Sequence, residues 1–139
     1  MNVKNILLVD DDSVCIFLTR NILQRLGFVN NIQTALNGKQ ALEFFNECTA
    51  GSKYLPDVIL LDLDMPVMGG FDFLETFRRL HSQDIAKVKI IIVSSSDNPD
   101  DIGRAKELGV NQFLTKPLQM ESLRKVLEVQ NGIPFSGIV

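Results

Sequence analysis

The chain has 139 residues, of which 45% are hydrophobic and 22% charged, and its formal net charge is −3. This length predicts one domain that can bury a core without disulfide bonds, and the composition is ordinary for a globular protein. The acidic balance disfavours nucleic-acid binding, because phosphate backbones are bound through clustered lysines and arginines. Neither a secretory signal nor an uncharged apolar stretch of about 18 residues is visible, so we expect a cytoplasmic protein with no membrane contact.

The first half of the chain shows two strand and helix pairs. Residues 6–9 form an apolar run too short for a helix, which predicts a strand covered on both faces. Asp12 or Ser13 can cap the helix that follows, and Gly27 stands where a C-terminal cap belongs. A weaker strand at residues 32–36 leads to a second helix. The apolar series of the first helix steps by four residues: Val14, Leu18, Ile22 and Leu26.

Three further strand and helix pairs follow, with strands expected at residues 58–61, 88–93 and 112–115. The run at 88–93 is the most β-branched in the chain, which predicts a central strand. The last helix is expected to complete a domain of residues 1–130, followed by a short C-terminal tail at residues 131–139.

Strand and helix thus alternate five times, which predicts an α/β fold of the (βα)5 type. Right-handed crossovers give a doubly wound, five-stranded parallel sheet with helices on both faces. The segment 31–38 is the least strand-like and is expected at a sheet edge, which gives the flavodoxin-like strand order 2-1-3-4-5. The first and third strands then flank the point where the winding reverses, the default ligand site of such sheets.

Five polar groups stand where apolar runs stop: Asp10, Asp11, Asp62, Ser94 and Lys116. The carboxyl ends of parallel strands share one edge, so all five would gather there. Each pair of carboxylates at roughly 4 to 5 Å would repel by about 3 to 4 kcal/mol at an effective dielectric of about 20. Mg²⁺ would relieve this repulsion, because it suits one or two direct carboxylates and several retained waters. Calcium is not indicated, because the sequence has no EF-hand loop.

A cation beside a carboxylate is also typical of phosphoryl transfer. Asp62 is the candidate nucleophile because it stands alone at a strand end, whereas Asp10 and Asp11 are adjacent. Lys116 would pair with a phosphoryl oxygen, and Ser94 would donate a hydrogen bond to another. Taken singly, these groups are ordinary caps, turn residues or a solvated lysine; their joint placement at different strand ends favours a site.

We assign no chemistry to the histidine and the cysteines. His81 lies near a helix end and is expected to be solvated or paired with the helix dipole. Cys15 and Cys48 lie inside helical patterns without CxxC spacing, which predicts small buried apolar side chains.

Residues 5–129 closely resemble the CheY-like receiver domains of two-component response regulators, with every motif in order. The motifs that carry the resemblance are Val9-Asp10-Asp11 (acidic pair), Asp62 (phosphoacceptor), Met65-Pro66 and Gly69-Gly70 (following loop), Ser94 (hydroxyl position) and Lys116-Pro117 (lysine and cis-proline turn).

The resemblance implies that Asp11 and Asp62 ligate Mg²⁺ directly, with the main-chain carbonyl of Asp64 as a third ligand and Asp10 acting through water. It also implies that Asp62 receives a phosphoryl group from a sensor histidine kinase or a histidine phosphotransfer protein. The aspartyl phosphate would be the signal. The protein would then not be an enzyme beyond self-phosphorylation and autodephosphorylation.

In relatives the hydroxyl residue moves toward the phosphoryl group and an aromatic residue rotates inward; the matching positions are Ser94 and Phe113. The switch would repack the face made by residues 98–108, 112–115 and 119–130 for an unknown downstream protein. The fourth and fifth helices are also the usual dimerisation face in relatives. Little chain follows the last helix, so a stand-alone receiver without a DNA-binding helix-turn-helix is expected; the alternative is that the sequence is one domain of a longer protein.

Two residues depart from the family's common pattern. Phe113 lacks the hydroxyl that many receivers carry as Tyr. Asp64 places a carboxylate at the rim, where other receivers often have Asn, a basic residue or an apolar one.

Two other functions are weighed against the receiver. Asp62-Leu63-Asp64 matches the DxD of haloacid-dehalogenase-like phosphohydrolases, but the acidic pair of this chain comes first and no cap domain is visible. The other alternative is a receiver-like binding module that is never phosphorylated.

Overall fold

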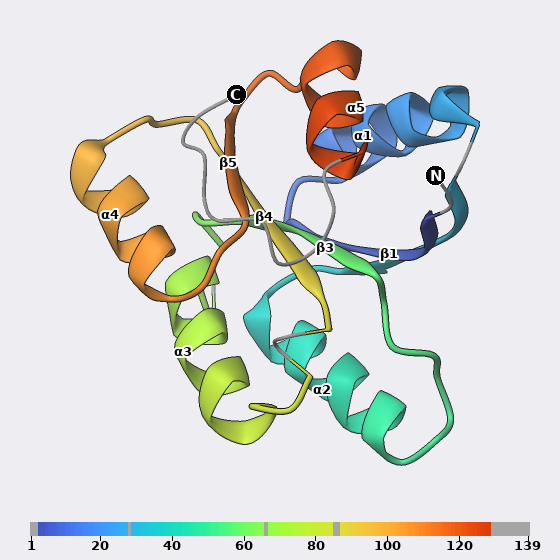
Figure 1. The fold of residues 1–139 in the computed structure, drawn as a ribbon, viewed down its shortest axis with the longest axis vertical. Helices are drawn as coiled ribbons and strands as arrows, with labels where there is room; N and C mark the ends of the chain where they lie inside the picture. The colour runs from blue at the N-terminus through green and yellow to red at the C-terminus, as the bar shows by residue number, and fades with distance from the viewer. Residues whose placement is uncertain (1–2, 28, 66, 85–86, 129–139) are drawn as a thin grey trace.

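The computed structural model describes residues 3–27, 29–65, 67–84 and 87–128. The expected tail at 131–139 lies outside them. Strands and helices alternate along the described chain, as Figure 1 shows: β1 (Val3–Val9), α1 (Ser13–Leu26), β2 (Val29–Ala35), α2 (Gly38–Thr49), β3 (Val58–Asp62), α3 (Gly70–Leu80), β4 (Lys89–Ser94), α4 (Pro99–Glu107), β5 (Gln112–Thr115) and α5 (Met120–Glu128).

The strands form a five-stranded sheet in the order β2-β1-β3-β4-β5, and each neighbouring pair is parallel. Helices α2, α3 and α4 cover one face of this sheet, and α1 and α5 cover the other (Figure 1). The predicted α/β fold, the doubly wound sheet with helices on both faces and the strand order 2-1-3-4-5 are therefore confirmed. Strand β4 lies between β3 and β5 and is buried along its whole length, so the prediction of a central strand rather than an edge strand is confirmed.

Strand β2 begins and ends earlier than predicted, because it pairs with β1 from Val3↔Val29 to Val9↔Ala35. Its sequence hides this boundary, since Asn30 and Asn31 are exposed and look like loop residues. An edge strand tolerates such polar side chains, because it is not enclosed by strands on both sides.

Helix α1 buries only part of the apolar series that its sequence shows. Asp12 caps the helix, accepting a hydrogen bond from the N–H of Val14 at 2.9 Å. Thr19 and Leu23 are buried, whereas Val14 and Leu18 are 63% and 56% exposed. The four-residue series therefore marks the helix correctly, but only Ile22 and Leu26 of the series pack against the core, because α1 carries apolar side chains on two faces.

His81 is buried at the C-terminal end of α3, so the expectation of a solvated ring was wrong, while pairing with the helix dipole stays a prediction. Its ring packs against Phe77 and Phe45, with centroids 5.6 and 5.9 Å away. Its Nδ1 lies 3.6 Å from a carboxylate oxygen of Asp84. The turn that ends α3 therefore directs the ring into the aromatic cluster on the α2 and α3 face.

Within the part of the chain that the structure describes, no helix combines the length and the apolar character needed to cross a membrane.

Gly70 allows α3 to begin directly against the end of β3. A Cβ atom on Gly70 would lie 2.7 Å from the carbonyl oxygen of Asp62 and 2.9 Å from the Cα of Leu63. Both are main-chain atoms that cannot rotate away. We expect Gly70→Ala to lower the free energy of unfolding by about 1 to 3 kcal/mol in urea denaturation, because the added methyl group overpacks this junction.

Gly103 provides the matched control, since a Cβ there meets no atom within 4 Å and the residue lies inside α4. Gly103→Ala should stabilise the protein by about 0.5 to 1 kcal/mol through helix propensity. Equal stability of the two variants would contradict the close packing of Gly70.

Candidate functional site

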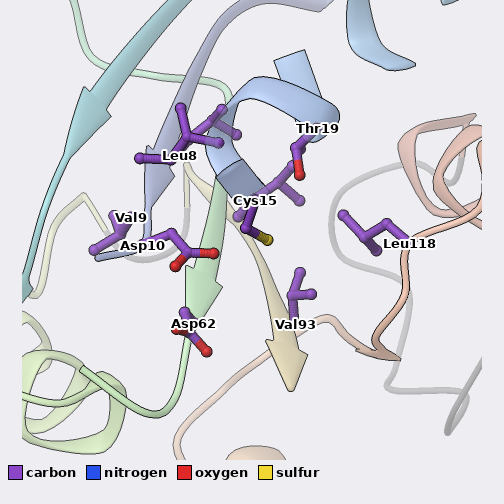
Figure 2. A pocket seen from close by; sticks show the side chains of 10 residues that line it. Leu8, Val9, Asp10, Cys15, Thr19, Asp62, Val93 and Leu118 are labelled. Atoms are coloured by element: carbon purple, nitrogen blue, oxygen red, sulfur yellow. The ribbon is translucent and has the colours of Figure 1, made fainter. Parts of the chain in front are cut away.

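The predicted site residues gather at the carboxyl edge of the sheet. Asp10 follows β1, Asp62 and Ser94 are the last residues of β3 and β4, and Lys116 follows β5. Strand pairing brings these ends together, because Val9 is opposite Leu61 and the next pairs connect β3 to β4 and β4 to β5. Figure 2 shows the carboxylates of Asp10 and Asp62 at the ends of neighbouring strands.

Three carboxylates form a compact cluster at this edge. Asp10, Asp11 and Asp62 each offer one oxygen atom, and these atoms lie within 4.8 Å of one another. Asp10 and Asp62 are buried, whereas Asp11 is exposed. Hard oxygen donors with one exposed member fit Mg²⁺, which binds through a few carboxylates and keeps several waters.

Lys116 places its ammonium group against two of these acids. Its Nζ lies 3.3 Å from Asp10 Oδ2 and 3.6 Å from Asp62 Oδ1. The main-chain N–H of Lys116 donates to the carbonyl of Ser94 at 2.7 Å, and the peptide bond to Pro117 is cis. The lysine is thus fixed by its backbone at the end of β5.

The charges of the site shift the pKa values of both partners. Burial raises the pKa of Asp62 to about 6; Lys116 opposes this shift and Asp10 adds to it. Burial acts to lower the pKa of Lys116, but the carboxylates of Asp62 and Asp10 outweigh it, so the pKa lies above its usual value. Lys116 is therefore a permanent cation, and it offsets part of the repulsion within the cluster.

Main-chain groups orient the two buried acids. Asp10 Oδ1 accepts a hydrogen bond from the N–H of Asp12 at 3.0 Å. Asp62 Oδ1 accepts from the N–H of Asp64 at 3.4 Å, which brings the main chain of Asp64 to the site while its side chain is exposed. The start of α1 and the loop after β3 thus set the positions of both carboxylates.

The two predicted switch residues are both buried. Ser94 is 1% exposed, and its Oγ accepts a hydrogen bond from the N–H of Ser96 at 3.1 Å. Phe113 is fully buried in the cluster on the α2, α3 and α4 face. An inward rotation of Phe113 therefore has no exposed starting position in this conformation.

Cys15 lies in the site, which the sequence analysis missed. With Asp10, Thr19 and Asp62 it lines a cavity of about 20 Å³, enough for one water molecule (Figure 2). Burial, with a further contribution from Asp10, raises the pKa of the Cys15 thiol to about 11. The thiol stays protonated at neutral pH, and no reaction is assigned to it. Its position in the first turn of a helix that begins at the site was the signal available in the sequence.

An apolar groove runs beside the site between α1 and the turn after β5. It measures about 350 Å³, and its lining includes Val14, Leu18, Pro117 and Leu118. The exposed side chain of Phe17 also belongs to α1. The sequence could have indicated this groove, because α1 has a second apolar face.

Comparisons with known proteins assign this chain and its fold to one family. The family model of the response regulator receiver domain matches residues 6–128. The probable methanogenesis regulatory protein FilR2 of Methanothrix harundinacea is 33% identical over 123 residues, covering 88% of this chain and 78% of that protein. The crystal structure of a two-component response regulator from Cytophaga hutchinsonii superposes with a TM-score of 0.84 at 27% identity, covering 91% of this chain and 96% of that one.

A different kind of relative is hybrid signal transduction histidine kinase I of Dictyostelium discoideum, 29% identical over 127 residues. The match covers 91% of this chain but 7% of that kinase. The chain therefore belongs to the response regulator receiver domain family, and its function is that of a phosphoacceptor receiver in signal transduction.

Removing one acid should relieve the crowding of the carboxylates. We expect Asp11→Asn to leave the stability of the metal-free protein unchanged or to raise it by about 1 to 3 kcal/mol, and to abolish stabilisation by Mg²⁺. Urea denaturation with and without MgCl₂ measures both effects.

Glu43→Gln is the control, because Glu43 is exposed on α2 and the substitution removes the same charge. It should keep the Mg²⁺ response of the wild type. A full Mg²⁺ response in Asp11→Asn would show that Asp11 does not hold the metal.

Proposed function

We propose that Asp62 is the phosphoacceptor of this receiver. The observation that carries the proposal is the buried Asp62 carboxylate, 3.6 Å from the Lys116 ammonium and within 4.8 Å of two other acids. An oxygen of Asp62 attacks the phosphorus of a phosphohistidine, the P–N bond breaks, and the imidazole leaves with its electron pair and takes a proton. The product is an aspartyl phosphate.

The neighbouring residues have separate roles in this transfer. Lys116 pairs with one phosphoryl oxygen, and the hydroxyl of Ser94 donates to another. Asp11, Asp62 and the main-chain carbonyl of Asp64 would hold Mg²⁺, with Asp10 acting through a water molecule. When bound, Mg²⁺ offsets the negative charge of the transferring phosphoryl group.

We further propose a histidine kinase or a histidine phosphotransfer protein as the phosphoryl donor. The relative in Dictyostelium is named as a hybrid histidine kinase, which supports this class of partner. The apolar groove between α1 and the Lys116-Pro117 turn suits an apolar helix face of the donor. Cys15 lines both this groove and the cavity behind Asp62, so a donor seated there would lie next to the phosphoacceptor.

The phosphorylated protein would act on a downstream protein through the face of α4, β5 and α5, which would also serve any weak dimer. The net charge of −3 argues against nucleic acid as the direct target. In this proposal the protein acts in the cytoplasm and performs no chemistry beyond its own phosphorylation and dephosphorylation.

Acetyl phosphate tests the phosphoacceptor directly. With MgCl₂, intact-mass spectrometry should show one phosphoryl group on the wild type and none on Asp62→Asn. Asp10 is also buried against Lys116, but it is adjacent to Asp11 and has the water-mediated metal role in this proposal, whereas Asp62 stands alone at the end of β3. Asp97→Asn, in an exposed loop residue, should label like the wild type. Labelling of Asp62→Asn would refute the assignment, and steady turnover of p-nitrophenyl phosphate would favour a phosphohydrolase.

Asp64 is expected to tune the lifetime of the phosphoryl group. Its side chain is exposed at the rim, and its charge adds to the negative potential at Asp62. We expect Asp64→Asn to change the rate of dephosphorylation by about two- to tenfold, since it alters the charge that an incoming water molecule meets. Decay of the phosphorylated mass after removal of acetyl phosphate measures the rate, and equal lifetimes would reject the role.

A further inference from the structure

Helix α4 is attached to the core through few buried side chains. Ala105 is its buried residue, and Ile102 packs partly buried against the same core cluster. By comparison, α3 buries Phe73, Leu74 and Phe77. A helix with so little buried area is easily displaced, so contacts on its outer side weigh more in fixing its position.

Two arginines supply such contacts between α3 and α4. The guanidinium of Arg104 lies over the ring of Phe71, 4.5 Å from its centroid, and forms an ion pair with Glu75. Arg78 donates from Nη1 to the main-chain carbonyl of Glu107 at 2.9 Å, at the C-terminal end of α4. The α3 residues of this set lie on one face of that helix, since they are spaced by four and three positions. We call these contacts the arginine latch.

A chain of hydrogen bonds connects Ser94 to the start of α4. The N–H of Ser96 donates to Ser94 Oγ at 3.1 Å, and the N–H of Asn98 donates to Ser96 Oγ at 3.3 Å. Asn98 caps α4, its side chain accepting from the N–H of Asp100 at 2.9 Å. A movement of the Ser94 hydroxyl toward a phosphoryl group would therefore pull on the first turn of α4.

Phe113, the other residue expected to move, already occupies an inward position. Phe113 is fully buried in the same cluster as Ala105, so its ring cannot turn inward any further. A response to phosphorylation that starts at Ser94 would then fall on the loop 95–98 and on α4. The arginine latch opposes that movement, because it ties α4 to α3.

We infer that the arginine latch is a regulatory device that holds α4 in its unphosphorylated position and so opposes the phosphorylated state. The inference rests on the proposed function of Asp62 and describes how that site is regulated. A ligand that mimics the phosphoryl group must break the latch before the protein can switch, and its apparent affinity is reduced accordingly.

Beryllofluoride with saturating Mg²⁺ is the probe, and isothermal titration calorimetry measures its apparent affinity. Arg104→Gln removes the ion pair and the contact with the Phe71 ring, and we expect it to tighten binding about three- to tenfold, as surface contacts of this kind allow. Unchanged or weaker binding by Arg104→Gln would overturn the latch.

Lys53→Gln is the matched control, because Lys53 makes the same two kinds of contact: an ion pair with Glu47 at 3.4 Å and a position over the Phe44 ring, 5.3 Å from its centroid. The side chains of Lys53 and Glu47 are 41% and 49% exposed, against 47% and 51% for Arg104 and Glu75. Both partners of Lys53 belong to α2, away from the face of α4, β5 and α5. Lys53→Gln should bind beryllofluoride like the wild type; equal tightening in both variants would point to net charge and reject the latch.

Amide hydrogen exchange without beryllofluoride separates the latch from the proposed function. Arg104→Gln should exchange faster than the wild type at residues 99–107 and equally at residues 38–49 of α2. If the wild type binds no beryllofluoride, the proposed function fails and the regulatory role fails with it, whereas the exchange experiment still shows whether Arg104 holds α4 in place. Faster exchange in α4 with unchanged beryllofluoride affinity would leave a contact without a regulatory role and overturn the inference.

Discussion

The mutual repulsion of carboxylates at one edge of the sheet is the constraint on which the site depends. Two buried acids and an exposed one lie within 4.8 Å of one another, and Lys116 is the cation that the described residues place against the buried pair. One ammonium cannot neutralise three carboxylates. The excess charge makes the site receptive to a divalent cation, and the cation in turn makes it receptive to a phosphoryl group.

The fold provides this arrangement through short, rigid connections. Parallel strands end at the same edge, and close packing at Gly70 fixes the loop that follows Asp62. Main-chain N–H groups at the start of α1 and after β3 orient the two buried acids. The repulsive cluster is therefore supported by main-chain packing, while the elements that respond to it, the loop after Ser94 and α4, are held by weaker contacts on the surface.

The sequence predicted the fold well because strand endings carry the signal. Apolar runs that stop at Asp10, Asp62, Ser94 and Lys116 define both the strands and the edge at which they meet. The residues that mark the strand ends are therefore also the residues of the predicted site. The burial of His81 was missed because it depends on how the turn after α3 returns to the aromatic cluster, which no local pattern encodes.

Two other features could not be predicted from the sequence, for related reasons. Helix α1 has apolar residues on two faces, and periodicity cannot tell which face meets the sheet. The contacts of Arg78 and Arg104 join residues 29 positions apart, and exposed arginines look alike in a sequence. Such contacts follow from the relative placement of whole helices, which only the assembled structure provides.

The most direct test of the central claim is a crystal structure with Mg²⁺ and beryllofluoride. The account expects the metal between Asp11 and Asp62, beryllium bonded to an oxygen of Asp62, and fluorine atoms in contact with Lys116 Nζ and Ser94 Oγ. A structure in which the acid cluster holds no metal, or in which beryllofluoride lies away from Asp62, would contradict the account.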